Sequence, residues 1–276
     1  MREMVEPESC YIEAHGLRLH YLDWGNQNAE PILLVHGLQD CSGLWNSFAV
    51  EFREHYHVIA LDQRGHGDSE RANPNCYKIS DYVRELSEVI EALDLKNLTL
   101  IGHSAGAKNS WIYTADNPER LDKLILVDMD PDSFNPGSEE MRKRYREESD
   151  LYTDMKAVTE RLRVRQPNAT QEMLLQNATA MTKLLPDGQL TWRRDREVVT
   201  SYDRPDAWDY LPKIRVPTLL VHGAISTLLV SKVADRMEQM IPDCARVDIP
   251  DGGHWSHLEF PSLFAEAVAK FLEPSD

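Results

Sequence analysis

A buried strand, a tight turn and the start of a helix follow one another in LTLIGHSAGAKNS, residues 98–110, and no other stretch constrains the fold as strongly. The turn is GHSAG at residues 102–106, a Gly-x-Ser-x-Gly pattern in the strand–turn–helix setting that gives it meaning. Side chains two residues before or after Ser104 would clash in so sharp a turn, which explains both glycines. The turn predicts a strained serine whose hydroxyl is presented to a substrate carbonyl. A serine that only caps a helix is the alternative.

Short aliphatic runs alternate with amphipathic helical stretches through much of the chain. This alternation predicts an α/β fold, with a mostly parallel, twisted eight-stranded sheet flanked by helices. One helix is expected over residues 79–95 and another over the final LFAEAVAKFL. The eight expected strands begin near Cys10, Arg18, Ile32, His57, Leu98, Lys123, Pro217 and Ala245.

Residues 132–212 break the alternation, because they hold polar helical sequence with Pro, Gly and Asn breaks and no convincing strand. A helical insertion after the sixth strand predicts a cap over the end of the sheet where ligands bind and where Ser104 lies. We therefore divide the chain into a core domain, residues 1–131 and 213–276, and a helical cap, residues 132–212. A merely structural excursion is the alternative.

Composition excludes several classes of partner. The net charge of −16 would repel nucleic acid and anionic membranes, so neither is an expected partner. No apolar run approaches the ~18 residues of a membrane span, and the acidic MREMVEPESC lacks the apolar core of a signal peptide. The four cysteines are scattered, without metal or disulfide spacing. We expect a cytoplasmic monomer or homodimer that acts on a small molecule and needs no metal or cofactor.

A serine hydroxyl needs a base to take its proton, and His254 is the best candidate among ten histidines. It follows the last expected strand, on a Gly252-Gly253 turn before the final helix, and loops at strand ends often carry catalytic groups. The sharp turn directs His103 away from the hydroxyl. His257 is the fallback base.

The carboxylate that orients this histidine is not where it is usually found. The loop after the seventh strand reads GAISTLLV, and Ile225 stands where an aspartate would be expected. The neighbouring sixth strand ends in Asp128, with Asp130 two residues later, and we choose Asp128 over Asp130. Two further aspartates, Asp248 and Asp251, are too close to the histidine in sequence to face its far nitrogen easily.

An oxyanion hole requires two backbone amides near the serine. The Ala105 amide lies at a helix N-terminus, and the turn after ILLVHG should present the amide of Leu38. Gln39 could add a side-chain contact to the substrate. Candidate pocket residues, which ordinary packing would explain equally well, are Trp45, Met129, Trp192 and Trp255. The turn DQRGHGDS at 62–69 is expected to form a structural network near the site, through Asp62, Arg64 and His66.

The motifs HGLQD, DQRGHGDS, GHSAG and the terminal GGH occur in the order and approximate spacing of the α/β-hydrolase fold superfamily. The chain resembles that superfamily over essentially its whole length outside the insertion. Dehalogenases and epoxide hydrolases of the superfamily use an aspartate nucleophile, so Ser104 argues against both. Members whose acid follows the sixth strand include (acetamidomethylene)succinate hydrolases, zearalenone lactonases and cofactor-free dioxygenases. GHSAGAKNS and the spacing to Asp128 resemble the first of these groups.

Together these features predict a cofactor-independent serine esterase or lactonase that cleaves a carboxylic ester or lactone through an acyl-enzyme. Ser104 would be the nucleophile, His254 the base and Asp128 the acid of the triad. One alternative is a cofactor-free dioxygenase, in which the histidine and aspartate deprotonate a hydroxylated heteroaromatic ring. Another is a non-catalytic receptor on a hydrolase scaffold, which the missing acid after the seventh strand favours.

Overall fold

The computed structural model describes residues 6–73 and 76–273, so the first five residues of the stretch that argued against a signal peptide lie outside it. Its central sheet has eight strands in the order β1-β2-β4-β3-β5-β6-β10-β11. β1 and β2, and β2 and β4, pair antiparallel, while the other neighbours are parallel. The predicted mostly parallel sheet is confirmed. Its strands are β1 (Glu8–Ala14), β2 (Leu17–Asp23), β3 (Pro31–Val35), β4 (His57–Leu61), β5 (Leu98–His103), β6 (Leu121–Val127), β10 (Thr218–Gly223) and β11 (Cys244–Ile249).

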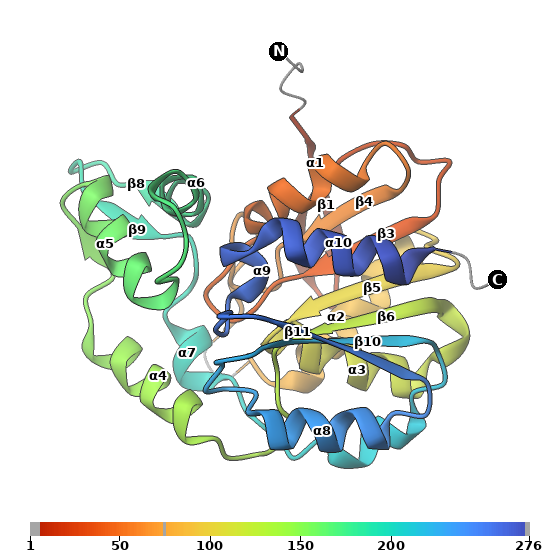
Figure 1. Cartoon of the computed structure of the whole chain (residues 1–276). Coiled ribbons are helices and arrows are strands. Elements are labelled where there is room, and N and C mark those ends of the chain that lie inside the picture. Colours follow the sequence, from red (N-terminus) through yellow and green to blue (C-terminus); the bar gives the residue numbers. More distant parts are fainter. Residues whose placement is uncertain (1–5, 74–75, 274–276) are drawn as a thin grey trace.

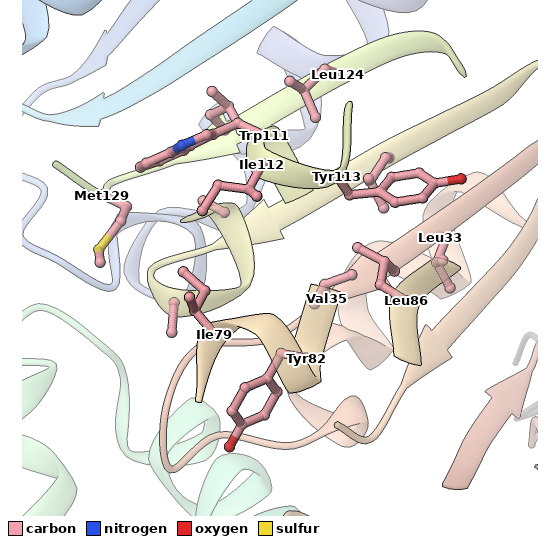
Figure 2. Packing of buried hydrophobic residues seen from close by; sticks show 14 of the residues in the cluster. Leu33, Val35, Ile79, Tyr82, Leu86, Trp111, Ile112, Tyr113, Leu124 and Met129 are labelled. Carbon is pink, nitrogen blue, oxygen red and sulfur yellow. The ribbon is translucent and has the colours of Figure 1, made fainter. Parts of the chain in front are cut away.

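Helices cover both faces of the sheet, because alternate strand side chains point to opposite faces. In β3, Leu33 and Val35 join a buried cluster with α2 (Ile79–Ala92), α3 (Ala105–Asp116) and α8 (Ser231–Met240), part of which Figure 2 shows. Ile32 and Leu34 join the opposite cluster with α1 (Asn46–Phe52) and α10 (Pro261–Leu272). No helix in the described part of the chain combines the length and apolarity needed to cross a bilayer.

The chain between β6 and β10 lies beside the sheet, on the side toward which the arrow of β5 points (Figure 1). Its elements are α4 (Pro136–Glu147), β7 (Leu151–Tyr152), α5 (Met155–Arg165), α6 (Gln171–Met181), β8 (Thr182–Leu184), β9 (Leu190–Trp192), α7 (Glu197–Ser201) and the 3₁₀ helix η3 (Trp208–Lys213). We call residues 132–212 the insertion, and their status as a separate cap domain stays a prediction.

The expectation that the insertion contains no strand was wrong. β7, β9 and β8 pair antiparallel into a small three-stranded sheet. These strands have only two or three residues each, too few to show the apolar–polar alternation by which a strand is recognised in a sequence. Whether these residues form strands is determined by the segments with which they pair and not by their own composition. A buried cluster that includes Val158, Leu162 and Leu174 packs the insertion against Trp255 and Leu44 of the rest of the chain.

α3 starts so close to the end of β3 that only glycine fits at the crossing. A Cβ on Gly106 would lie 2.4 Å from the carbonyl oxygen of Val35 and 2.5 Å from that of His36. A Cβ on Gly102 would lie 2.5 Å from the carbonyl oxygen of Gly106. The steric reason given for the two glycines of the turn is therefore confirmed. These backbone contacts fix where the turn between β5 and α3 lies in the sheet.

We expect Gly106→Ala to lower the free energy of unfolding by about 3 kcal/mol, because backbone atoms would have to move to make room. Gly253→Ala is the control, since its Cβ would only reach Glu259 Oε2 at 3.6 Å, and it should cost less than about 1 kcal/mol. Urea unfolding followed by circular dichroism measures both. Equal destabilisation by the two substitutions would contradict the packing argument.

Candidate active site

Ser104 stands between β5 and α3 with φ 53° and ψ −123°, backbone angles that non-glycine residues rarely adopt. Its amide donates to the carbonyl oxygen of Val127 at 2.9 Å, which ties the turn to the end of β6. Its Oγ lies 2.9 Å from Nε2 of His254. The strained turn therefore directs the hydroxyl at a histidine that is distant in sequence.

His254 reaches this place because the loop between β11 and α9 (Ser256–Glu259) packs closely on β10. A Cβ on Gly223 would lie 2.1 Å from the carbonyl oxygen of Gly253, so glycine is required at the end of β10. Nε2 of His103 donates to the carbonyl oxygen of His254 at 2.9 Å. Burial lowers the pKa of His254 below its ordinary value of 6.5, although the hydrogen bond with Asp128 opposes this shift.

Asp128 faces the far nitrogen of this histidine from the end of β6. Its Oδ1 lies 2.8 Å from Nδ1 of His254, and the residue has a φ of 47° and is fully buried. Oδ1 also accepts from Oγ of Ser226 at 2.6 Å, and Oδ2 accepts from the amide of Gly223 at 2.9 Å. The last residue of β10 and the loop after it therefore bind the carboxylate of Asp128. This is the loop in which sequence analysis first looked for the acid. Sequence analysis missed Ser226, because its partner is not visible in the chain order.

The other aspartates considered are engaged elsewhere. Asp130 is buried and contacts the guanidinium of Arg204 and the amide of Asn135. Asp248 binds Arg246 and His222, and the backbone oxygen of Asp251 accepts from Asn168. The structure thus brings Asp128, and none of these three, to His254.

The buried rings of His103 and His257 pack against each other beside the candidate site, with their centroids 4.3 Å apart. The ring centroids of His257 and Trp45 are 5.0 Å apart. Burial lowers the pKa of His257 well below the ordinary value. Nδ1 of His103 lies 3.3 Å from Oδ2 of Asp40. Burial raises the pKa of Asp40, but the contact with His103 and the charge of Arg165 outweigh it and hold the pKa well below its ordinary value. No hydrogen bond joins His257 to Ser104 within the described residues.

The two amides expected to bind an oxyanion lie at the start of α3 and in the loop after β3. In the described part of the chain, neither the Leu38 nor the Ala105 amide donates to a backbone carbonyl. Helix geometry leaves the first amides of α3 without an intrahelical acceptor, and the helix dipole makes this end attractive to an anion. The side chain of Gln39, predicted to contact the substrate, accepts from Nε of Arg194 at 3.1 Å.

The turn at 62–69 forms the structural network that its composition predicted. Asp62 accepts from the amide of Ser42 at 2.6 Å and contacts His20 at 2.7 Å. Arg64 makes a buried, two-point ion pair with Glu85. Nε2 of His66 accepts from the Gln39 amide at 3.2 Å. This network therefore supports the loop after β3.

Trp255, one of the four candidate pocket residues, lies beside His254, with the two ring centroids 4.7 Å apart. Trp45 packs among Phe48 and Phe264 in the core, and Trp192 packs on Tyr152 in the insertion. Met129 is buried in the cluster that contains Trp111 (Figure 2). A role of any of the four in substrate binding stays a prediction.

The cysteines do not gather at the site. Cys10, Cys41, Cys76 and Cys244 are free thiols. Among the residues that the structure describes, no three or more His, Cys, Asp or Glu side chains are grouped so that they could hold a metal ion.

Comparisons with known proteins agree with this architecture. The 2-(acetamidomethylene)succinate hydrolase of Mesorhizobium japonicum is 26% identical over 245 residues, which is 88% of this chain and 87% of that protein. Esterase YbfF of Escherichia coli is 26% identical over 254 residues, 89% of this chain and 94% of its own. The crystal structure of E-2-(acetamidomethylene)succinate hydrolase superposes with a TM-score of 0.89 at 24% identity, covering 97% of this chain and 100% of that one.

The relatives with hydrolase and esterase names support a hydrolase, while the structural likeness supports the fold. A family model described as the alpha/beta hydrolase fold matches residues 30–261, a span that runs from the loop before β3 to the start of α10. The motifs at the strand ends and six of the eight sheet strands, β3 to β6 with β10 and β11, lie within this span. The chain therefore belongs to the alpha/beta hydrolase fold family.

Proposed function

We propose that the protein hydrolyses a carboxylic ester or lactone through an acyl-enzyme, with Ser104, His254 and Asp128 as catalytic triad. The observation that carries this proposal is the continuous hydrogen-bonded chain from Ser104 Oγ through both ring nitrogens of His254 to Asp128, at 2.9 and 2.8 Å. A serine, a base within hydrogen-bond reach and a group that orients the base are the elements of an activated nucleophile. No metal or cofactor is required for this chemistry.

In the first half of the reaction, Ser104 Oγ attacks the carbonyl carbon while its proton passes to Nε2 of His254. The resulting imidazolium is stabilised by Asp128, whose carboxylate is held by Ser226 and the Gly223 amide. The carbonyl oxygen becomes an oxyanion, which the amides of Leu38 and Ala105 would bind. Collapse of this intermediate breaks the ester C–O bond. The leaving alkoxide takes the proton from His254.

In the second half, water attacks the acyl-enzyme and gives its proton to the now neutral His254. A second oxyanion forms and collapses, and Ser104 leaves with the proton held by the imidazolium. The products are the carboxylic acid and the free enzyme. With a lactone, the alcohol and the acid are parts of one ring-opened product. Every proton transfer uses Nε2, so the hydrogen bond at Nδ1 fixes the required tautomer.

The one sequence feature that favours a non-catalytic receptor is the missing carboxylate after β10. In the structure Asp128 contacts the histidine instead, and Ser226 of that same loop supports it. This arrangement supports an enzyme over a receptor. The named relatives differ in reaction. The proposal that the substrate is an ester or a lactone therefore rests on the geometry around Ser104 and not on these relatives.

We expect Ser104→Ala to lower kcat by about 10⁴-fold or more, because the nucleophile is lost. Initial-rate hydrolysis of short p-nitrophenyl esters, measured for both proteins, tests this. Retained ester hydrolysis by the variant would contradict the acyl-enzyme mechanism. Oxygen uptake with a hydroxylated heteroaromatic, in the absence of ester hydrolysis, would favour the dioxygenase.

We expect Asp128→Asn to lower kcat by about 10³- to 10⁴-fold, because an amide cannot hold the histidine in the productive tautomer. Asp130→Asn should lower kcat by less than about tenfold per folded molecule, although it leaves Arg204 without its buried partner and lowers stability. Rates are normalised to the folded fraction from circular dichroism. Equal losses of kcat in the two variants would contradict the assignment of Asp128.

The rate should also report the lowered pKa of His254. Only the neutral imidazole accepts the serine proton, so kcat/KM rises with pH through the pKa of the free enzyme's base. Because burial lowers that pKa, the midpoint of the acid limb should lie below the ordinary 6.5. A pH–rate profile of ester hydrolysis, with circular dichroism at each pH to show that the protein stays folded, measures it. A midpoint above 6.5 would contradict this expectation.

A further inference from the structure

The loop after β3, residues 37–40, carries one proposed oxyanion amide and adopts a backbone conformation that needs support. Gln39 has a φ of 73°, in the left-handed region that non-glycine residues enter only at a cost. Such a conformation persists where surrounding contacts enforce it. The groups that hold this loop therefore also set the position of the Leu38 amide.

Two buried arginines of the insertion contact consecutive side chains of this loop. Arg194, which follows β9, donates to Gln39 Oε1 at 3.1 Å and binds Asp150 at 2.7 and 3.1 Å. Arg165, the last residue of α5, donates to Asp40 Oδ1 at 3.0 Å. The two arginine side chains are 2% and 4% exposed. Both contacts therefore lie in the interior, where solvent screens them little.

Asp40 brings a buried negative charge close to the nucleophile. A Cβ placed on Gly37 would lie 3.0 Å from Asp40 Oδ2 and equally 3.0 Å from Ser104 Cβ. An oxyanion that forms on the carbonyl attacked by Ser104 would be repelled by an uncompensated carboxylate at this range. Arg165 supplies the compensating charge, and its guanidinium stacks over Trp255 at 4.3 Å from the ring centroid.

We propose that Arg165 is a positioning residue for the oxyanion hole. It neutralises Asp40 and, through it, holds the 37–40 loop, while Arg194 holds the same loop through Gln39. The insertion thus supports the loop that carries one of the two proposed oxyanion amides. The effect on turnover rests on the proposed function, whereas the effect on the loop does not.

A double-mutant cycle tests the charge coupling. We expect Arg165→Gln to lower kcat for p-nitrophenyl esters by about 30-fold with KM changed less than about threefold, because the lost stabilisation belongs to the transition state. In an Asp40→Asn background, the same Arg165→Gln change should cost less than about threefold, because no carboxylate charge remains to be neutralised. An equal cost in both backgrounds would overturn the coupling.

Hydrogen–deuterium exchange tests the positioning without requiring turnover. We expect the amides of Leu38 and Gln39 to exchange at least about tenfold faster in Arg165→Gln than in wild type, because the loop loses a buried contact. Arg163→Gln is the control, since Arg163 lies on the same helix but contacts Ala169 and Gln171 instead. It should leave both the exchange of this loop and kcat unchanged.

The two hypotheses fail in different ways. If wild type and Ser104→Ala hydrolyse the ester equally, the proposed function fails and the exchange experiment alone decides the role of Arg165. If exchange of residues 37–40 is the same in Arg165→Gln as in wild type and Arg163→Gln, the positioning role is wrong. A lower melting temperature of Arg165→Gln with unchanged kcat per folded molecule would also overturn it, because that is the behaviour of a residue with a purely structural role.

Discussion

The site depends on backbone segments that approach one another more closely than any side chain would allow. Gly106 brings the start of α3 against the end of β3, and Gly223 brings the His254 loop against the end of β10. These two approaches bring Ser104 and Asp128, which lie on neighbouring strands, within hydrogen-bond reach of one histidine. A methyl group at either glycine would overlap a backbone carbonyl, so the segments that carry Ser104 and His254 could not keep these positions. The close backbone contacts at the strand ends therefore determine where the side chains of the candidate site lie.

The carboxylate that contacts His254 comes from the end of β6, although sequence analysis looked for it first after β10. β6 and β10 are parallel neighbours, so their carboxyl ends meet at the same edge of the sheet. A carboxylate at either end can reach Nδ1 of His254. The last residue of β10 supplies the Gly223 amide and the loop after it supplies the Ser226 hydroxyl, and both bind the carboxylate of Asp128. These two donors keep the buried charge of Asp128 hydrogen-bonded, as a buried carboxylate requires.

Sequence predicted the features that local pattern determines, and it failed where distant partners decide. The eight sheet strands followed from aliphatic runs, and the turn at Ser104 followed from two glycines at fixed spacing. β7, β8 and β9 were missed because two or three residues carry no periodicity. Ser226, Arg165 and Arg194 were missed for a related reason: each contributes through a contact with a residue tens of positions away. Contact of Gln39 with the substrate stays a prediction, and in the structure its side-chain oxygen accepts from Arg194 of the insertion.

The insertion contributes charge to an otherwise costly arrangement. Asp40, Arg165 and His103 are all buried, and an isolated ion in such a place would be strongly disfavoured. Replacing the whole group by apolar side chains would often preserve or raise stability, so stability alone does not account for it. Asp40 lies near Ser104 and binds Arg165 of the insertion, so the group links the insertion to the proposed reaction. A charge pair of this kind is balanced only when both partners are in place, and one partner belongs to α5 while the other belongs to the loop that carries Leu38. Turnover would then depend on how the insertion is seated, and residues far from the scissile bond would influence kcat as well as substrate choice.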